Sequence, residues 1–321
     1  MKRRRRIVIG ALVLLAAASG IWLERELLAK IWTRTLPEGG LLELRVRRAE
    51  PDRLEWIGGE GPRLAAEIYE PRAGGPGRAA VLLLHGNRAA GSRAPLYRLL
   101  SRAMADAGCF VLALNLRGFG GSEPAPAGRA VTALDLQLDV ERGATALGLR
   151  APAGIPRAVV GHSLGANLAL RFAPREGWRA VAVEPGLHVR QRAVEPPAPA
   201  LDEYTRKLRG TLRGGIVDRE SVRLLYRDLD PQAPGDPVAP EFLLVLQGWQ
   251  VPAEDRDSIR ATAAARTGTA LHFLDSRDHD FGTVEAGGWI FHPRGLTRAL
   301  VDTTVAFVIS GSAPAGLSSK S

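Results

Sequence analysis

Uninterrupted runs of apolar residues mark the strands that this chain predicts. Ala79–Leu84 contains six apolar residues in succession, which is typical of a parallel strand covered on both faces. Two mainly apolar segments, 54–57 and 64–69, flank a Gly- and Pro-containing turn and predict a β-hairpin. Further runs of the same kind lie at 110–114, 158–160, 180–183, 242–246 and 271–274.

Helix-length stretches separate most of these runs, at 94–107, 131–147, 164–172 and 255–266. Such alternation predicts a mostly parallel sheet with helices on both faces. The exception is 186–240, which is charged, contains several prolines and has helical stretches near 201–208 and 219–226 but no strong strand run. An excursion of this length is typical of a cap over a ligand site. We predict one α/β domain over 41–310 with this helical cap inserted, and a disordered tail over 311–321.

The amino terminus has the pattern of an export signal. Five basic residues, 2–6, precede the uncharged run Ile7–Leu23, and the positive-inside bias places whatever follows this run outside the cytoplasm. The run is long enough to span a bilayer, with Trp22 at the interface, so we predict an uncleaved anchor within residues 1–30. Alternatively, Ala16–Ala18 offers a small-residue cleavage site, which would release a periplasmic or secreted protein.

Composition narrows the class of protein. Apolar residues make up 45% and charged residues 24%, which excludes a disordered or collagen-like chain. Five positive charges of the net +9 lie in residues 2–6 and the rest are dispersed, so we predict no nucleic-acid partner. The single cysteine, Cys109, excludes internal disulfides and Cys-rich metal sites, and its apolar surroundings predict burial. Arginine far outnumbers lysine, which favours a bacterial source with a GC-rich genome.

The strongest chemical signal is Gly161-His-Ser-Leu-Gly165, directly after one predicted strand and before a predicted helix. In this context Gly-x-Ser-x-Gly predicts a nucleophile elbow, because its glycines permit a turn sharp enough to expose the Ser163 hydroxyl. The helix amino terminus beneath the serine favours developing negative charge. We interpret His162 as a packing or supporting residue and not as the base.

A second loop supplies candidate oxyanion donors. The strand that ends at Leu84 leads into His85-Gly-Asn87. Acyl transfer needs two N–H groups aimed at the oxyanion. We predict that they are the backbone groups of Asn87 and of Leu164, the residue after the nucleophile.

Three segments together resemble a known family: 82–87 (Leu-Leu-Leu-His-Gly-Asn), 112–122 (Leu-Ala-Leu-Asn-Leu-Arg-Gly-Phe-Gly-Gly-Ser) and 160–165. Over about residues 54–309 the chain resembles α/β-hydrolases of the serine-aminopeptidase and monoglyceride-lipase type. The resemblance implies an α/β-hydrolase fold, a Ser–acid–His triad, a small-molecule acyl substrate and neither cofactor nor metal. The family often has His where Phe119 stands, in a turn that shapes the site without chemistry. Serine at the elbow disfavours the branches with an aspartate nucleophile, such as epoxide hydrolases.

The triad order places the base on a loop after the last strand. That strand is 271–274, and the loop after it contains His279, followed two residues later by Phe281, as is common in the family. We therefore predict His279 as the base. His272, within the strand, and His292, which lies farther along, are interpreted as structural.

The acid does not follow the family pattern. The loop Gln247–Pro252, where the family usually has Asp, contains no carboxylate. Glu184 ends the strand after the nucleophile helix, a position at which pancreatic-type lipases place their acid, and a buried carboxylate there is costly without a role. We predict Glu184. The alternatives are Asp255, which would otherwise serve as a helix-start charge, and a neutral partner such as Gln250.

Two classes of function follow. The first is an exported or membrane-anchored serine hydrolase that cleaves an ester, or alternatively a thioester or amide, through an acyl-enzyme. An acyltransferase would use the same residues. The second is a non-catalytic binding or assembly protein that keeps the fold at the membrane. The first is favoured because Ser163, His279 and both oxyanion segments are present.

Overall fold

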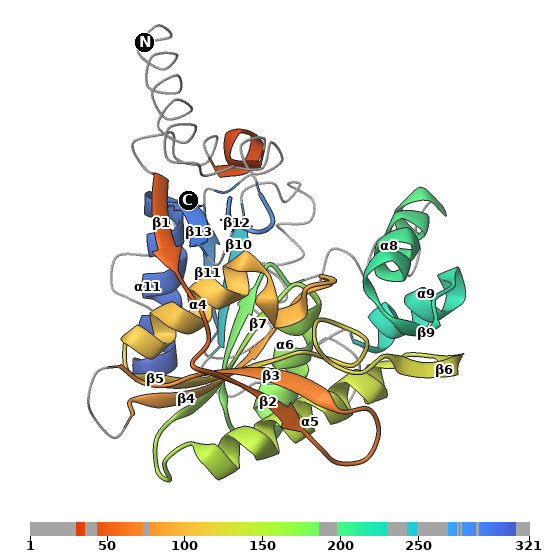
Figure 1. The fold of residues 1–321 in the computed structure, drawn as a ribbon, viewed down its shortest axis with the longest axis horizontal. Coiled ribbons are helices and arrows are strands. Elements are labelled where there is room, and N and C mark those ends of the chain that lie inside the picture. Colours follow the sequence, from red (N-terminus) through yellow and green to blue (C-terminus); the bar gives the residue numbers. More distant parts are fainter. Residues whose placement is uncertain are drawn as a thin grey trace, which may run out of the picture.

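A computed structural model describes residues 30–35, 44–72, 77–185, 198–229, 243–248, 269–274, 276, 278–286 and 289–312. Its centre is an eight-stranded sheet in the order β11-β10-β8-β7-β4-β5-β3-β2 (Figure 1). The strands are β2 (Arg53–Ile57), β3 (Leu64–Tyr69), β4 (Ala79–Leu84), β5 (Cys109–Leu114), β7 (Arg157–His162), β8 (Arg179–Val183), β10 (Leu243–Gly248) and β11 (Thr269–Leu274). From β11 to β5 all neighbours are parallel, whereas β3 pairs antiparallel with β5 on one side and with β2 on the other. The mostly parallel sheet and the β2–β3 hairpin are therefore confirmed.

In the part of the chain that the structure describes, helices cover both faces of this sheet (Figure 1). On one face lie α4 (Pro95–Asp106) and α11 (Arg294–Ser310), and on the other α5 (Ala133–Arg150) and α6 (Leu164–Glu176). Alternate β4 side chains enter opposite cores: Leu82 packs on the α5–α6 side, and Leu83 on the α4–α11 side. β4 and β5 are buried at every position, on both faces, which explains their unbroken apolar runs. Cys109 is buried as predicted, and burial raises the pKa of its thiol to about 11.

A small antiparallel sheet was not predicted. It consists of β1 (Leu44–Arg48), β13 (Trp289–Pro293) and β12 (Val284–Ala286), beside the π-helical turn Ile31–Thr35. These strands are short: β12 has three residues and β13 five, and β1 reads Leu-Arg-Val-Arg-Arg, in which apolar and basic residues alternate over only a few positions. The sheet brings the two ends of the hydrolase domain together.

The cap region contains α8 (Ala198–Thr211) and α9 (Arg219–Asp228), as predicted, and a short strand, β9 (Gly214–Ile216), which was not. Figure 1 shows these elements at one side of the molecule, next to β6 (Ala125–Ala130), with which β9 pairs. Backbone hydrogen bonds also connect the cap to the main domain: Arg213 donates to the Gly118 oxygen at 2.9 Å and accepts from Ala125 at 2.8 Å.

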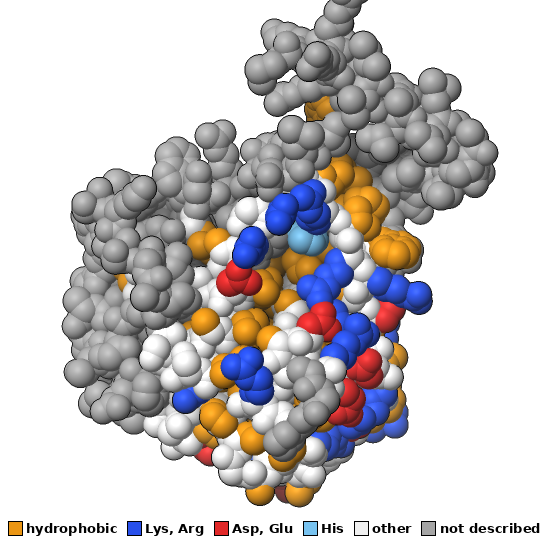
Figure 2. Space-filling view, turned by 90° about the vertical axis from the view of Figure 1, so that its left-hand side faces the viewer, with side chains coloured by type: hydrophobic (Ala, Val, Ile, Leu, Met, Phe, Trp, Pro, Cys, Tyr) orange, Lys and Arg blue, Asp and Glu red, His pale blue; other side chains and the backbone are white. Residues whose placement is uncertain are grey.

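The charges of the main domain are largely paired. Figure 2 shows basic and acidic side chains interleaved on the side where β1 and α11 lie, and the pairs there include Arg47 with Asp106. In the turn after β5, Arg117 forms a buried bidentate ion pair with Asp139 of α5, with contacts of 3.0 and 2.8 Å. This pair holds the turn that contains the buried Phe119.

Several predictions fall on residues outside the described ranges. These are the anchor Ile7–Leu23, the candidate acid Asp255, the helix at 255–266 and most of the predicted tail; α11 ends at Ser310. Among the residues that the structure does describe, no helix has the length and apolar character needed to cross a membrane.

Candidate active site

The candidate nucleophile lies at a sharp turn between β7 and α6. Ser163 has φ 52° and ψ −114°, and α6 begins at the next residue. A Cβ on Gly161 would lie 2.1 Å from the Gly165 oxygen, so the turn excludes any side chain there. Non-glycine residues rarely adopt positive φ, and those that do cluster at functional sites. The sharp strand–helix turn that the sequence predicts is thus present at Ser163.

The loop with the predicted oxyanion donor packs against this elbow. A Cβ placed on Gly86 would lie only 2.9 Å from the Cβ of Ser163, so the two turns approach within van der Waals contact. Leu164 is the first residue of α6, and its N–H precedes the helix's own hydrogen-bond ladder. Asn87 is half-buried in the facing loop. Both predicted donors therefore belong to segments that meet at Ser163.

The predicted acid and base also come together. Glu184 is the first residue after β8 and is almost fully buried, while His279 is 44% exposed. The distance from Glu184 Oε2 to His279 Nδ1 is 3.8 Å, longer than a hydrogen bond, but catalytic hydrogen bonds in unliganded enzymes often tighten only with substrate. Glu184 thus faces the Nδ1 side of the His279 ring.

Backbone geometry delivers Glu184 to this place. The Ser163 N–H donates to the Val183 oxygen at 2.9 Å, so the strand end that precedes Glu184 is bonded to the elbow itself. Glu184 then takes φ 48°, another positive value at a non-glycine residue. The alternative acid, Asp255, and the neutral alternative, Gln250, lie outside the described residues.

The loop that carries His279 is fixed on both sides. Phe281 is fully buried at φ 54°, and Gly282 N–H donates to Asp278 Oδ2 at 2.9 Å. An ion pair between Arg88 and Asp280 joins this loop to the loop 85–90, which contains the predicted donor Asn87 and is here called the oxyanion loop. His272 lies in β11 and His292 in β13, both within strands and apart from this loop.

One residue of the site has no signal in the sequence. Tyr97, on α4, accepts a hydrogen bond from Gly86 N–H at 2.8 Å and lies 2.8 Å from His162 Nδ1. His162 Nε2 lies 2.9 Å from the carbonyl oxygen of His279. The interpretation of His162 as a supporting residue therefore agrees with its contacts.

Burial keeps two histidines of the site neutral. It lowers the pKa of His162 to about 3, with the neighbouring His279 acting in the same direction. It lowers the pKa of His85 to about 4, despite a hydrogen bond to the Gly86 oxygen. Neither ring changes charge in the folded protein near neutral pH.

These shifts predict an acid-sensitive fold. Below pH 6.5 His162 is protonated in the unfolded chain but not in the folded one. The contribution of His162 to the free energy of unfolding is therefore fully present above pH 6.5 and is lost as the pH falls toward 3. At about 1.4 kcal/mol per pKa unit, this one histidine removes about 2 kcal/mol between pH 7 and pH 5. We expect urea unfolding of the His162→Gln variant to show that much less pH dependence than wild type. Equal pH dependence in the two proteins would contradict the assignment.

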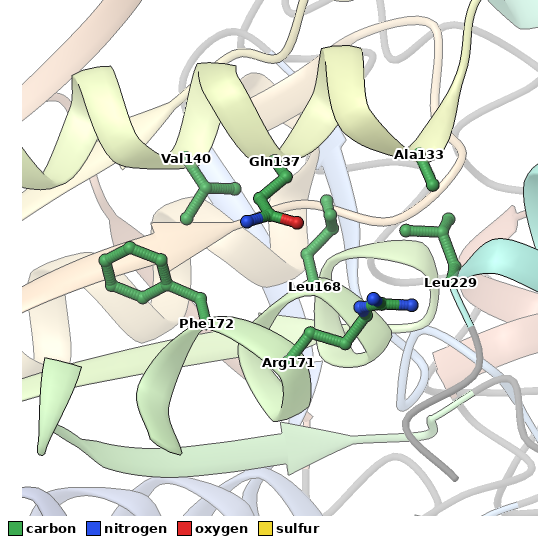
Figure 3. A pocket seen from close by; sticks show the side chains of 7 residues that line it. All are labelled: Ala133, Gln137, Val140, Leu168, Arg171, Phe172 and Leu229. Atoms are coloured by element: carbon green, nitrogen blue, oxygen red, sulfur yellow. The ribbon is translucent and has the colours of Figure 1, made fainter. Parts of the chain in front are cut away.

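The cap reaches the oxyanion loop directly. Thr211, the last residue of α8, donates a hydrogen bond from Oγ1 to Oδ1 of Asn87. Beneath the cap, a small separate cavity lies between α5 and α6 (Figure 3). It is lined by Ala133, Gln137, Val140, Leu168, Arg171, Phe172 and Leu229, and none of the predicted site residues belongs to it. Within the described residues, no group of three or more His, Cys, Asp and Glu side chains is arranged to hold a metal ion.

Comparison with known proteins agrees with this architecture. Residues 81–310 match the model of the alpha/beta hydrolase family, and the chain belongs to that family. Sequence comparison found no curated relative.

Solved structures show the same fold at low identity. Est1E from Butyrivibrio proteoclasticus is similar with a TM-score of 0.56 and 13% identity, over 80% of this chain and 98% of that one. Alpha/beta hydrolase domain-containing protein 10 from mouse is similar with a TM-score of 0.51 and 15% identity, over 74% of this chain and 93% of that one. XC6422 from Xanthomonas campestris, a serine hydrolase without a lid, is similar with a TM-score of 0.50 and 17% identity, over 81% of this chain and 93% of that one.

Proposed function

We propose that this chain is a serine hydrolase that cleaves carboxylic esters through an acyl-enzyme, with Ser163, His279 and Glu184 as its triad. One observation carries the proposal: a serine held at positive φ on a strand–helix elbow lies beside the strand end that presents Glu184 to the His279 ring. Segments from four separate parts of the chain converge there, as serine acyl transfer requires.

The mechanism follows from these positions. Ser163 Oγ attacks the acyl carbonyl and passes its proton to Nε2 of His279, whose charged ring is stabilised by Glu184 at Nδ1. The N–H groups of Leu164 and Asn87 bind the oxyanion. Collapse of the tetrahedral intermediate expels the alcohol, which takes the proton from His279. Water then attacks the acyl-enzyme and passes a proton to Nε2 of His279. The second tetrahedral intermediate collapses, Ser163 Oγ takes that proton, and the carboxylic acid leaves.

A substrate panel tests this function. The purified full chain would be assayed in detergent with nitrophenyl esters of short and long acyl chains, and with peptide anilides. We expect turnover of at least one ester and less activity on the amides, because amide cleavage needs better leaving-group protonation. Product analysis with an added alcohol would identify acyl transfer. No turnover on the whole panel would favour the binding or assembly alternative.

We further propose that the enzyme is anchored in a bacterial inner membrane with its hydrolase domain outside the cytoplasm. Basic residues 2–6 and the apolar run Ile7–Leu23 support this topology. Trp32, which is 57% exposed, follows the run by nine positions, and tryptophan favours the membrane–water interface.

The anchor makes a prediction of its own. Expressed full-length, the protein should sediment with membranes and resist carbonate extraction, since one apolar span holds it in the bilayer. Protease added outside the inner membrane should digest the hydrolase domain. A soluble product that begins at Ser19 would instead show signal cleavage, and protection from external protease would contradict export.

A further inference from the structure

Besides the Arg88–Asp280 ion pair, a continuous hydrogen-bond chain connects the oxyanion loop to the loop 278–283 that contains His279, here called the base loop. Gly86 N–H can only donate, so the Tyr97 oxygen accepts from it and the Tyr97 proton points to His162 Nδ1. His162 Nε2 therefore carries the ring proton and donates it to the carbonyl oxygen of His279. The direction of every bond follows from the backbone groups at the two ends.

We propose that Tyr97 and His162 are positioning residues that hold the oxyanion and base loops at a fixed offset from Ser163. This inference rests on the serine hydrolase function proposed above. This hydrogen-bond chain includes the residues that directly precede two of the proposed catalytic groups: Gly86 precedes the donor Asn87, and His162 precedes the nucleophile Ser163. It then reaches the backbone of the base itself. Catalytic groups tolerate displacements of only about 0.5 Å, and an error of 1 Å can cost about a hundredfold in rate.

The surroundings suit a fixed link. Tyr97 and His162 are 1% and 2% exposed, and the His162 and His279 rings lie 4.5 Å apart. Burial keeps His162 neutral, so one ring nitrogen donates and the other accepts, and the His279 carbonyl and the Tyr97 hydroxyl fix which is which. A buried hydroxyl could, however, serve stability alone, so the test must separate the two roles.

Tyr69 provides a matched control. Tyr69 is as buried as Tyr97 and packs in the same core cluster. Its hydroxyl donates a hydrogen bond to Glu67 at 3.0 Å, and Glu67 is not one of the predicted site residues. Tyr97→Phe and Tyr69→Phe each delete one buried hydroxyl from the same side of the sheet. Loss of stability should be similar, whereas only Tyr97→Phe should disturb the site.

We expect Tyr97→Phe to lower kcat by about tenfold or more with KM within about twofold, because the loops shift while the binding surface stays. Tyr69→Phe should keep kcat within about twofold. Equal kcat in Tyr97→Phe and wild type, or equal losses in both variants, would overturn the proposal.

Two substitutions of His162 distinguish its hydrogen bond to the His279 carbonyl from its hydrogen bond to Tyr97. His162→Gln can still present an N–H near the His279 carbonyl, whereas His162→Asn is too short to reach it and keeps only an acceptor near Tyr97. We expect His162→Gln to keep kcat within about fivefold of wild type and His162→Asn to lose more than about tenfold. The opposite ranking would contradict a link through the His279 carbonyl.

Hydrogen exchange tests the link without reference to activity. Tyr97→Phe should speed amide exchange in peptides covering 85–90 and 278–283, and Tyr69→Phe should leave both unchanged. Unchanged exchange in Tyr97→Phe would overturn the positioning role even in an active enzyme. Failure of wild type to react with a fluorophosphonate at Ser163 would instead retire the proposed function, and exchange would still decide whether Tyr97 holds the loops.

Discussion

Replacing Ser163 with alanine is expected to lower ester turnover by more than about 10⁴-fold while the protein stays folded. The substitution removes the attacking oxygen, and loss of the nucleophile in serine hydrolases leaves only the contributions of binding and the oxyanion donors. One atom is lost at a half-buried turn, so the unfolding free energy should change by no more than about 1 kcal/mol. Steady-state kinetics and urea unfolding on the same preparation measure both.

Two further variants sharpen this experiment. Ser163→Gly should be equally inactive but more stable than Ser163→Ala by about 1 kcal/mol, because glycine adopts φ 52° without strain. Ser310→Ala, on an exposed turn of α11, serves as a neutral control. Turnover near the wild-type rate in purified Ser163→Ala protein would rule out Ser163 as the nucleophile.

The second large effect concerns the acid. Glu184→Gln is expected to lower kcat at least about a hundredfold, because the amide cannot stabilise the charged His279 ring during acylation. Asp255→Asn should lower kcat only a few-fold, as a helix-start charge would. Kinetics on the same ester, with each protein shown to be folded, compare the two.

A buried carboxylate elsewhere is the appropriate control. Glu67 of β3 is 2% exposed and bonded to Tyr69, so Glu67→Gln tests whether loss of any buried charge slows the enzyme. We expect its kcat to stay within about threefold of wild type. The reverse ranking of Glu184 and Asp255 would move the acid to Asp255, and two near-neutral results would favour a neutral partner such as Gln250.

The middle of the central sheet could be predicted from the sequence because β4, β5, β7 and β8 are buried at nearly every position, on both faces. Ala79–Leu84 must then be apolar at every position, and this pattern survives without knowledge of the partners. The β1–β13 pair could not be predicted in the same way, because β1 is half exposed and mixes arginine with apolar residues. The strand β9 is three residues long, and its pairing with β6 depends on backbone bonds made by Arg213 that no local pattern indicates.

Some residues of the candidate site could be predicted from the sequence and others could not. Ser163, Asn87 and His279 lie at strand ends or in loops with sequence signatures, so their convergence follows from topology once the strand order is known. Glu184 was predicted from its strand position, without a motif. Tyr97 carries no such signal, because an apolar helix face predicts that it is buried and says nothing of its hydroxyl. Its contacts with Gly86 and His162 arise only when α4 packs on the sheet.

The most direct test of the account is the mass of the intact protein after treatment with a fluorophosphonate. We predict one adduct per chain, mapped by peptide sequencing to Ser163, absent from Ser163→Ala and formed at the wild-type rate in Ser310→Ala. An unchanged mass after full exposure to the reagent, or an adduct on any other residue, would contradict the assignment of Ser163 as the nucleophile.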